Sequence, residues 1–371
     1  MKQLLGLAVT LKIASFLIAV WAFRLLPFCQ RCWWVNFLYP RPQELKWFSV
    51  FKTWDGQHYL YLSQQGYVPE QMSNAFFPLW PWLIRAGTTL VGGNSLLVAM
   101  VLAHVFSLVV LVLFYKLVRH LYSARMAFRA GVLLLTFPTA FYLHLPYSEA
   151  LFLCLVVGGI YALVRRRWLW AAGLWYLMPL ARVQGMLMIV PLIVEMVVSH
   201  RKARRISMLP YMFVGGAFML GVATYFLFMQ LGTGSWNGGF AALKFYGNYY
   251  SLSLLLKPWE WVRLNFLESF LVLHGYRFSV IDRLFFAVFL LVLALGWRRI
   301  EKVLVSVMVV LGLVVALSGT FTSYPRYLLV VFPMYIVLAR VLGRWYMMVA
   351  MGGLMLQTLF LVMFSLNYWV A

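Results

Sequence analysis

The stretch "LFLCLVVGGIYALVRRRWLWAAGLWYLMPLA", residues 151–181, consists of two apolar runs separated by three consecutive arginines at 165–167. A helix of about 20 residues crosses the hydrocarbon core of a bilayer, so each run, with its flanks, approaches a membrane span. Arginines in a short loop between two spans are typical of a loop that stays on the cytoplasmic side. The stretch therefore predicts two membrane-spanning helices joined by a cytoplasmic turn.

The composition of the whole chain agrees with this prediction. Of 371 residues, 64% are hydrophobic and only 11% are charged, whereas a soluble domain carries about 25% charged residues. The net charge of +22 could suggest nucleic acid, but the basic residues gather in short gaps between apolar runs, which indicates membrane topology instead. These basic clusters lie at 116–129, 165–167, 200–205 and 298–302 and at Arg340 and Arg344.

The hydropathy pattern predicts an all-α polytopic membrane protein with about eleven spans and no separate soluble domain, so residues 1–371 form a single transmembrane domain. With the N-terminus in the cytoplasm, every basic cluster falls inside and the C-terminus falls outside. The first run is too long for a signal-peptide core and is interpreted as a retained span. The predicted spans are 3–27, 94–118, 126–143, 148–164, 168–182, 185–199, 208–231, 283–297, 303–320, 327–343 and 345–366.

The same topology gathers isolated polar residues on the extracytoplasmic face. The segments placed there are 28–93, 144–150, 181–185, 232–281 and 322–327, and they contain Asp55, Glu149, Arg182, Glu260, Glu268 and Arg326. Each alone could be an interfacial residue that reaches water. An ionisable residue at a membrane edge is costly, however, and indicates a functional site by default. Their convergence on one face favours a site.

The first extracytoplasmic region, 28–93, is predicted to hold two amphipathic helices that lie in the membrane interface, at 43–67 and 76–91. In the first of these, Asp55, His58 and Tyr59 follow the i, i+3, i+4 spacing of one helix face. A carboxylate beside an imidazole can hold and move a proton.

The cysteines and the metal-binding residue types are less informative. Cys29 and Cys32 form an isolated Cys-x-x-Cys, for which a local disulfide and two unpaired thiols both stay open. Cys154 lies in a predicted span and is interpreted as core packing. No His and Asp residues show metal-ligand spacing. No cofactor is expected, and a divalent ion at Asp55 and Glu149 stays an open alternative.

Five motifs follow one another along the chain: "WDGQHYLYLSQQGY" (54–67), "FFPLWP" (76–81), "FPTAFYLHLPYSEALF" (137–152), "LARVQGML" (180–187) and "SYPRYLLVVFPMY" (323–335). In this order they resemble the GPI mannosyltransferase 2 family of the C-type glycosyltransferases, over about residues 50–335. The chain is compact, which resembles bacterial members more than eukaryotic ones. The resemblance implies a polytopic enzyme that moves mannose from a polyprenyl- or dolichyl-phosphate donor to an acceptor hydroxyl on the extracytoplasmic face. It also implies a location in the bacterial inner membrane, or in the endoplasmic reticulum membrane of a eukaryote.

Such a reaction needs a base for the acceptor proton and cations for the leaving phosphate. Asp55 is the expected catalytic base, on the side of the sugar opposite the phosphate, which gives inversion. Arg182 and Arg326 are the expected phosphate ligands, because a guanidinium fork matches phosphate oxygens. The alternative for both arginines is a topological or ion-pair role.

Other residues of the same motifs are expected to bind the donor. Tyr147, Ser148 and Glu149 are candidates for sugar hydroxyls, with helix capping as the alternative for Ser148. His58 is expected to contact the phosphate or orient Asp55, with a structural hydrogen bond as the alternative. The remaining donor-binding candidates are Gln184, which stands where the family often has Asn, and Tyr327.

Two competing functions remain. A C-type transferase, ligase or polymerase acting on another lipid-linked sugar shares every feature above except the donor. A lipid or sugar transporter or flippase would instead show inverted repeats, broken helices and charges near mid-membrane, whereas the charges here favour one face. The expected partners are a polyprenyl-phosphate sugar, a glycolipid or glycan acceptor and membrane lipid, and not nucleic acid.

Overall fold

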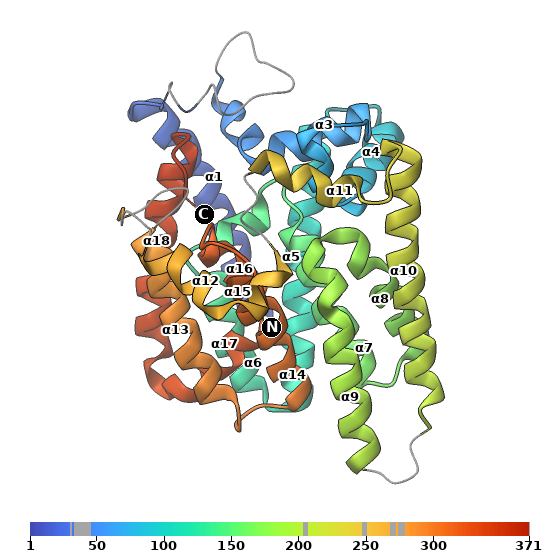
Figure 1. The fold of residues 1–371 in the computed structure, drawn as a ribbon. Coiled ribbons are helices and arrows are strands. Elements are labelled where there is room, and N and C mark those ends of the chain that lie inside the picture. Colours follow the sequence, from blue (N-terminus) through green and yellow to red (C-terminus); the bar gives the residue numbers. More distant parts are fainter. Residues whose placement is uncertain are drawn as a thin grey trace.

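The computed structural model describes residues 1–29, 32, 46–202, 207–246, 251–267, 272–273 and 279–370. Within these residues the chain forms helices and no β-strand, apart from one isolated bridge between Val272 and Ser279. The predicted all-α architecture of a polytopic membrane protein is therefore confirmed (Figure 1). Glu268, most of the 28–45 segment and residues 203–205 of the basic cluster at 200–205 lie outside the described residues.

A helix occupies each predicted span, although several helices are short. The longer helices are α1 (Lys2–Leu25), α5 (Ser95–Leu121), α6 (Ala124–Leu135), α7 (Glu149–Val164), α8 (Trp168–Ala181), α9 (Ile189–Lys202), α10 (Leu209–Thr233), α13 (Val280–Gly296), α17 (Pro333–Leu342) and α18 (Tyr346–Ser365). A further helical run is made of α14 (Lys302–Met308), η8 (Val309–Val314) and α15 (Val315–Leu317).

Among the described residues, five helical stretches are long and apolar enough to cross a bilayer. They are Lys2–Leu25, Ser95–Leu121, Val183–Arg201, Leu209–Thr233 and Pro333–Ser365. The number of about eleven spans therefore stays a prediction. Helices such as α6, with 12 residues, and α8, with 14, fall short of the roughly 20 residues that a crossing needs.

The short helices end where buried non-helical segments begin. After α6 the chain passes through Pro138 and the 3₁₀ turn η3 (Ala140–His144), whose residues are all buried. Proline cannot continue a helical hydrogen-bond ladder, so it helps to fix the end of α6. Non-helical backbone at membrane depth is tolerated where protein surrounds it. These segments carry the polar residues of the site described below.

The helices that hold the site are packed closely. α8 packs against both α7 and α10, and α7 packs against α5. At Gly221 of α10, an added Cβ would lie 2.1 Å from the carbonyl oxygen of Tyr176 in α8. Small residues let membrane helices approach in this way. The α8–α10 contact thereby fixes the position of the end of α8.

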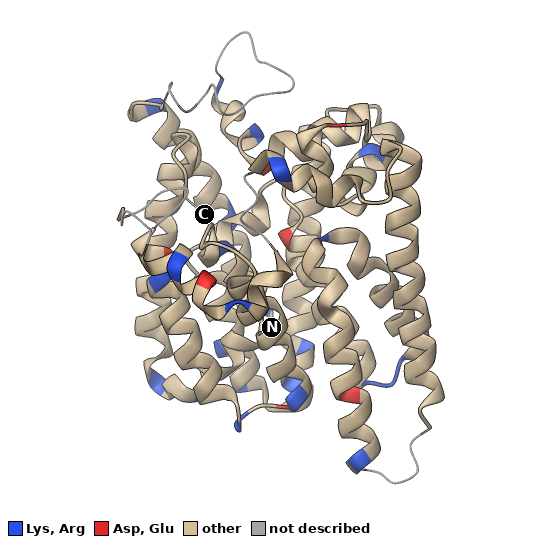
Figure 2. Cartoon of the chain, viewed as in Figure 1, with Lys and Arg blue, Asp and Glu red and all other residues tan. Residues whose placement is uncertain are grey.

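Three basic segments lie at the same end of the molecule, although basic residues also occur at the other end (Figure 2). The loop between α7 and α8, the loop between α13 and α14 and the far end of α9 all carry basic residues and lie at the lower end in Figures 1 and 2. The helices α3 (Asp55–Gln65), α4 (Leu79–Val91) and α11 (Gly238–Ala241) lie at the opposite end.

The region 28–93, predicted to be extracytoplasmic, departs from its predicted helices. In place of one helix over 43–67, the described part has a 3₁₀ turn, η1 (Trp47–Lys52), and then α3. The two are separated at Trp54, whose backbone is left-handed at φ 51°. Seven of the eleven residues of α3 are buried, so α3 packs into the protein instead of lying with one face in lipid. By contrast, α4 keeps an amphipathic pattern, with Ile84 buried and Leu90 exposed.

Cys29 and Cys32 are joined in a disulfide, which resolves the alternative left open by their spacing. The backbone N–H of Cys29 donates to the carbonyl of Leu366, 2.9 Å away, and Asn367 donates to the Cys29 carbonyl. The chain that follows α18 is thereby attached to the chain that follows α1. This contact positions the C-terminal residues, including Trp369, beside the candidate site.

Candidate functional site

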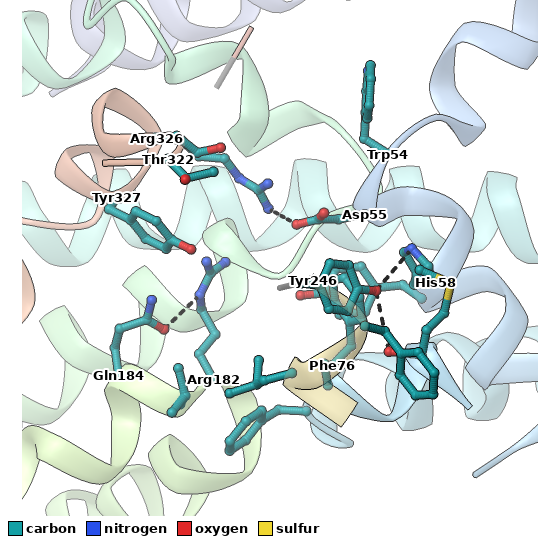
Figure 3. A pocket seen from close by; sticks show the side chains of 18 of the residues that line it. Trp54, Asp55, His58, Phe76, Arg182, Gln184, Tyr246, Thr322, Arg326 and Tyr327 are labelled. Carbon is teal, nitrogen blue, oxygen red and sulfur yellow. Dashed lines mark hydrogen bonds and ion pairs between the residues drawn. The ribbon is translucent and has the colours of Figure 1, made fainter. Parts of the chain in front are cut away.

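A cavity of about 640 Å³ lies beneath α3. Its polar wall is formed by residues from three distant segments: the start of α3, the end of α8 and the turn before α16 (Tyr324–Leu329). Figure 3 shows Asp55, Arg182, Arg326, Gln184 and Tyr327 around this wall. The lining also contains aromatic residues, among them Trp54, Phe76, Phe77, Phe245, Tyr246 and Trp369.

A chain of ion pairs joins the four charged residues of the site. Arg326 Nη2 lies 2.6 Å from Asp55 Oδ2, and Arg326 Nε lies 2.6 Å from Glu149 Oε1. The same Glu149 oxygen lies 2.7 Å from Arg182 Nη1. Two carboxylates and two guanidiniums therefore balance in charge. Four residues that the sequence places on one face are brought together here, whereas Glu260, also placed there, forms an exposed pair with Lys257.

Asp55 is presented to the cavity by an unusual backbone. Trp54, immediately before it, has φ 51° and ψ −127°, a conformation that side chains with a Cβ rarely adopt. Such strain persists where the surrounding structure fixes it, and it occurs most often at functional sites. The turn leaves Asp55 as the first residue of α3, with its side chain 28% exposed.

Arg326 is held from several sides. Ser323, which precedes α16, has φ 58°, and Pro325 lies in the first turn of that helix, where its missing N–H costs little. The guanidinium carbon lies 4.9 and 4.7 Å from the ring centroids of Tyr142 and Tyr147, within range of cation–π attraction. Its side chain is 7% exposed, so its direction is fixed by packing.

The turn before Arg326 is anchored to neighbouring segments. The Thr139 hydroxyl donates to the carbonyl of Pro325, 3.0 Å away. Asp282, in the first turn of α13, accepts a hydrogen bond from the backbone N–H of Tyr324, 3.2 Å away. Asp282 was not among the predicted site residues, because its sequence position indicates only the start of a helix.

Arg182 and Gln184 occupy the Arg-x-x-Gly turn at the end of α8. Arg182 Nε donates to Gln184 Oε1, 3.3 Å away. The next residue, Gly185, admits no side chain, because an added Cβ would lie 2.0 Å from the carbonyl oxygen of Met178. The turn therefore folds back onto α8 and points Arg182 toward Glu149, while Gln184 lines the cavity.

Tyr147 and Ser148 are fully buried and are not among the residues that line the cavity, and their contact with sugar hydroxyls stays a prediction. The Tyr147 hydroxyl donates to the Thr53 carbonyl, 3.0 Å away. Ser148 forms no side-chain helix cap. Its hydroxyl instead accepts from Arg182 Nη1 at 3.1 Å and lies 2.6 Å from the Tyr59 hydroxyl. Both residues therefore hold other members of the site in place, as does Glu149, whose side chain is 1% exposed.

His58 lines the cavity but does not contact Asp55 through a hydrogen bond. Its Nδ1 lies 2.8 Å from the Ser73 hydroxyl, and its Nε2 lies 3.4 Å from the Tyr246 hydroxyl. Its ring stacks on Phe76 at 4.7 Å. Burial lowers the pKa of His58 to about 4, although the charge of Asp55 acts in the opposite direction. The imidazole is therefore neutral at physiological pH.

Two aromatic residues of the site were missed by sequence reasoning. Tyr246 contacts His58 from the 232–281 loop, whose "FYGNYY" run hints at a stacking surface without singling out a residue. Trp369 packs edge-on against Trp54, with ring centroids 4.9 Å apart. The one sequence feature that could have indicated Trp369 is its position in the C-terminal segment, which the predicted topology places on the extracytoplasmic side. Within the described residues, no three His, Cys, Asp or Glu side chains are grouped so as to hold a metal ion.

Comparison with known proteins agrees with the motifs. Residues 40–209 match the family model described as mannosyltransferase (PIG-V). The chain is 34% identical over 131 residues to the GPI alpha-1,6-mannosyltransferase 2 of Rattus norvegicus, a match that covers 33% of this chain and 26% of the relative. It is 30% identical over 131 residues to the GPI mannosyltransferase 2 of Cryptococcus neoformans, covering 33% of this chain and 30% of that protein. These matches thus span less than a third of the relatives' length.

Among solved structures, an Archaeoglobus fulgidus oligosaccharyltransferase in complex with Zn and sulfate is similar. The TM-score is 0.47 at 13% sequence identity, and the alignment covers 96% of this chain and 53% of that one. The segment that matches the family model, 40–209, contains Asp55, Glu149 and Arg182, whereas Arg326 lies beyond it.

Proposed function

We propose that this chain, whose residues 40–209 match the mannosyltransferase (PIG-V) family model, transfers mannose from a polyprenyl-phosphate donor to a hydroxyl of a glycolipid or glycan. The observation that carries the proposal is the cavity in which one carboxylate, Asp55, faces two guanidiniums, those of Arg182 and Arg326. A lipid-phosphate sugar needs these two kinds of group and no further activation.

Arg182 and Arg326 hold the phosphate in this mechanism. The donor is a phosphodiester with one negative charge, and its leaving group becomes a phosphate monoester with up to two. Guanidiniums that are already fixed by Glu149 and by the rings of Tyr142 and Tyr147 stabilise the developing charge without rearranging. Arginine suits this role because its fork can bind two phosphate oxygens.

Asp55 is the base. The acceptor oxygen forms a bond to the anomeric carbon, the bond from that carbon to the phosphate oxygen breaks, and the acceptor proton passes to Asp55. Attack on the face opposite the phosphate inverts the anomeric carbon. His58 is neutral because burial lowers its pKa to about 4. It is held by Ser73 and Tyr246 and forms part of the cavity lining that the acceptor would contact.

The proposed setting is an integral membrane enzyme with a cytoplasmic N-terminus, a single transmembrane domain over 1–371, and the site on the extracytoplasmic side of a bacterial cell membrane. The distribution of basic loops supports this orientation, because they lie at the end of the molecule opposite α3. The aromatic residues that line the cavity offer ring faces on which a sugar can stack.

The experiment is a donor panel. Purified protein is incubated with polyprenyl-phosphate mannose, glucose and arabinose and a mixture of membrane glycolipids, and the release of polyprenyl phosphate is measured. Release from the mannose donor alone supports the proposal. Release from another donor alone assigns the protein to a different lipid-linked sugar. Movement of an intact lipid across a vesicle membrane without release would instead support a transporter.

A further inference from the structure

The residue proposed as the base and one residue proposed to hold the phosphate contact each other. Asp55 Oδ2 lies 2.6 Å from Arg326 Nη2, so the carboxylate occupies the approach to the guanidinium that a donor phosphate would use (Figure 3). A carboxylate and a phosphate oxygen both seek the same N–H groups of arginine. The arrangement in this structure therefore precedes donor binding.

The proposed reaction also excludes this contact in the reacting complex. In an inverting displacement the base and the leaving oxygen act on opposite faces of the sugar carbon. In inverting glycosidases, for comparison, the two catalytic carboxyl groups on opposite sides of the sugar stand about 6.5–9.5 Å apart. If Arg326 binds the leaving phosphate, a carboxylate 2.6 Å from the same Nη2 stays on the phosphate side. Asp55 must therefore leave Arg326 before it can act.

The two carboxylate contacts of Arg326 differ in a way that identifies which one is exchanged. Arg326 Nε donates a well-aligned hydrogen bond to Glu149, whose side chain is only 1% exposed. Nη2 is close to Asp55 but is not aligned for a hydrogen bond with it. The Asp55 side chain is 28% exposed and lines the cavity. Glu149 is thus the fixed partner, and Asp55 is the exchangeable one.

Resting on the proposed function, we propose that the donor phosphate displaces Asp55 from Arg326 and that this exchange releases the carboxylate as the base. Before the donor binds, the Asp55 carboxylate is held against the Arg326 guanidinium and is not directed at an acceptor hydroxyl. Once phosphate takes its place on the guanidinium, the free carboxylate can turn to the acceptor hydroxyl. Donor binding is therefore required before the acceptor can be deprotonated, and the donor binds first.

The exchange predicts an unusual property of an inactive variant. In Asp55→Asn the competitor for Arg326 is gone, so a polyprenyl phosphate should bind more tightly than to the wild-type protein. Loss of a partly exposed ion pair corresponds to a gain of about 2- to 5-fold in affinity, which is about 0.4–1 kcal/mol at 1.4 kcal/mol per tenfold. The neutral analogue polyprenol should bind both proteins equally.

The closing experiment is a double-mutant cycle of lipid binding. The dissociation constants of polyprenyl phosphate and of polyprenol are measured in nanodiscs for the wild type, Asp55→Asn, Arg326→Gln and the double variant. Removing the negative charge of Asp55 also favours the binding of any anion nearby, whether or not Arg326 is involved. Measuring the same substitution in the Arg326→Gln background shows how much of the gain depends on Arg326. We expect the gain in affinity for polyprenyl phosphate from Asp55→Asn to disappear in this background, because the guanidinium for which carboxylate and phosphate compete is absent.

The outcomes separate this inference from the function on which it rests. Equal affinity of wild type and Asp55→Asn for polyprenyl phosphate, or a gain that persists with Arg326→Gln, overturns the exchange and leaves the transferase proposal intact. Wild-type protein that binds polyprenyl phosphate no better than polyprenol contradicts the proposed function itself.

Discussion

Replacing Glu149 by Gln should destabilise the fold far more than the matched replacement of Asp55 by Asn. Glu149 Oε1 alone meets both Arg326 Nε, at 2.6 Å, and Arg182 Nη1, at 2.7 Å, and its side chain is 1% exposed. Neutralising it leaves two buried guanidiniums beside each other. Breaking a buried pair costs about 3–5 kcal/mol of unfolding free energy. Here Arg182 loses its ion pair, whereas Arg326 keeps the one with Asp55.

Asp55 provides the comparison within the same cluster. Within the described part of the chain its one ion pair is with Arg326, and its side chain is 28% exposed. Pairs that reach solvent contribute about 0–1 kcal/mol. The two amide variants should therefore differ in stability by about 3 kcal/mol, which follows from the difference in burial and pairing.

The assay is unfolding in one detergent, followed by the intrinsic fluorescence of the 16 tryptophans. A second variant combines Glu149→Gln with Arg182→Gln and so removes the guanidinium that has lost its ion pair. It should recover part of the unfolding free energy that Glu149→Gln loses, and the recovery measures the coupling between the two residues. Equal stability of Glu149→Gln and Asp55→Asn, or no recovery in the double variant, would refute the view that Glu149 organises the arginines.

Three further outcomes are expected. Gly185→Ala should give little folded protein, because its Cβ would lie 2.0 Å from the Met178 carbonyl oxygen, whereas Gly173→Ala, at a site with open space, should fold normally; equal yields would contradict the close turn. The pKa of His58, lowered by burial to about 4 from 6.5, means that below pH 6.5 the unfolded chain binds a proton that the folded chain does not. Stability should therefore fall by on the order of 3 kcal/mol from pH 7 to pH 4, and a His58→Gln variant should lose less over that range; identical pH profiles would be inconsistent with a buried neutral imidazole. A cysteine at position 166 should react with an impermeant maleimide in inside-out vesicles and not in intact cells, and the reverse pattern would invert the topology.

Most of the helices could be predicted from the sequence, because an apolar run has few alternatives in a bilayer. Their ends could not. The run over 126–143 reads as one span, yet α6 stops at Leu135, since Pro138 and a buried 3₁₀ turn take over. Likewise, the aromatic periodicity of 43–67 indicates one helix, and the left-handed backbone of Trp54 that interrupts it is imposed by tertiary contacts.

For the candidate site, the charged residues could be predicted from the sequence, but their contacts could not. Sidedness alone collected Asp55, Glu149, Arg182 and Arg326 on one face, because charges are rare in this chain and each is conspicuous. Their pairing was not predictable, since Arg326 and Glu149 are 177 positions apart and only the fold determines which carboxylate meets which guanidinium. Tyr246 was missed for the opposite reason, because aromatic residues make up 18% of the chain and no single one stands out.

The assignment of Asp55 as the base is tested most directly by the turnover of Asp55→Asn. The variant keeps the size of the side chain but cannot accept the acceptor proton. Loss of a general base costs about 10²–10⁴-fold in rate. The single-turnover rate of mannose transfer is measured for wild type and Asp55→Asn, with the unfolding midpoint of the same preparations as the control for folding. We expect the rate to fall by at least about 100-fold at an unchanged midpoint. A folded Asp55→Asn protein that turns over at a near-normal rate would contradict the account.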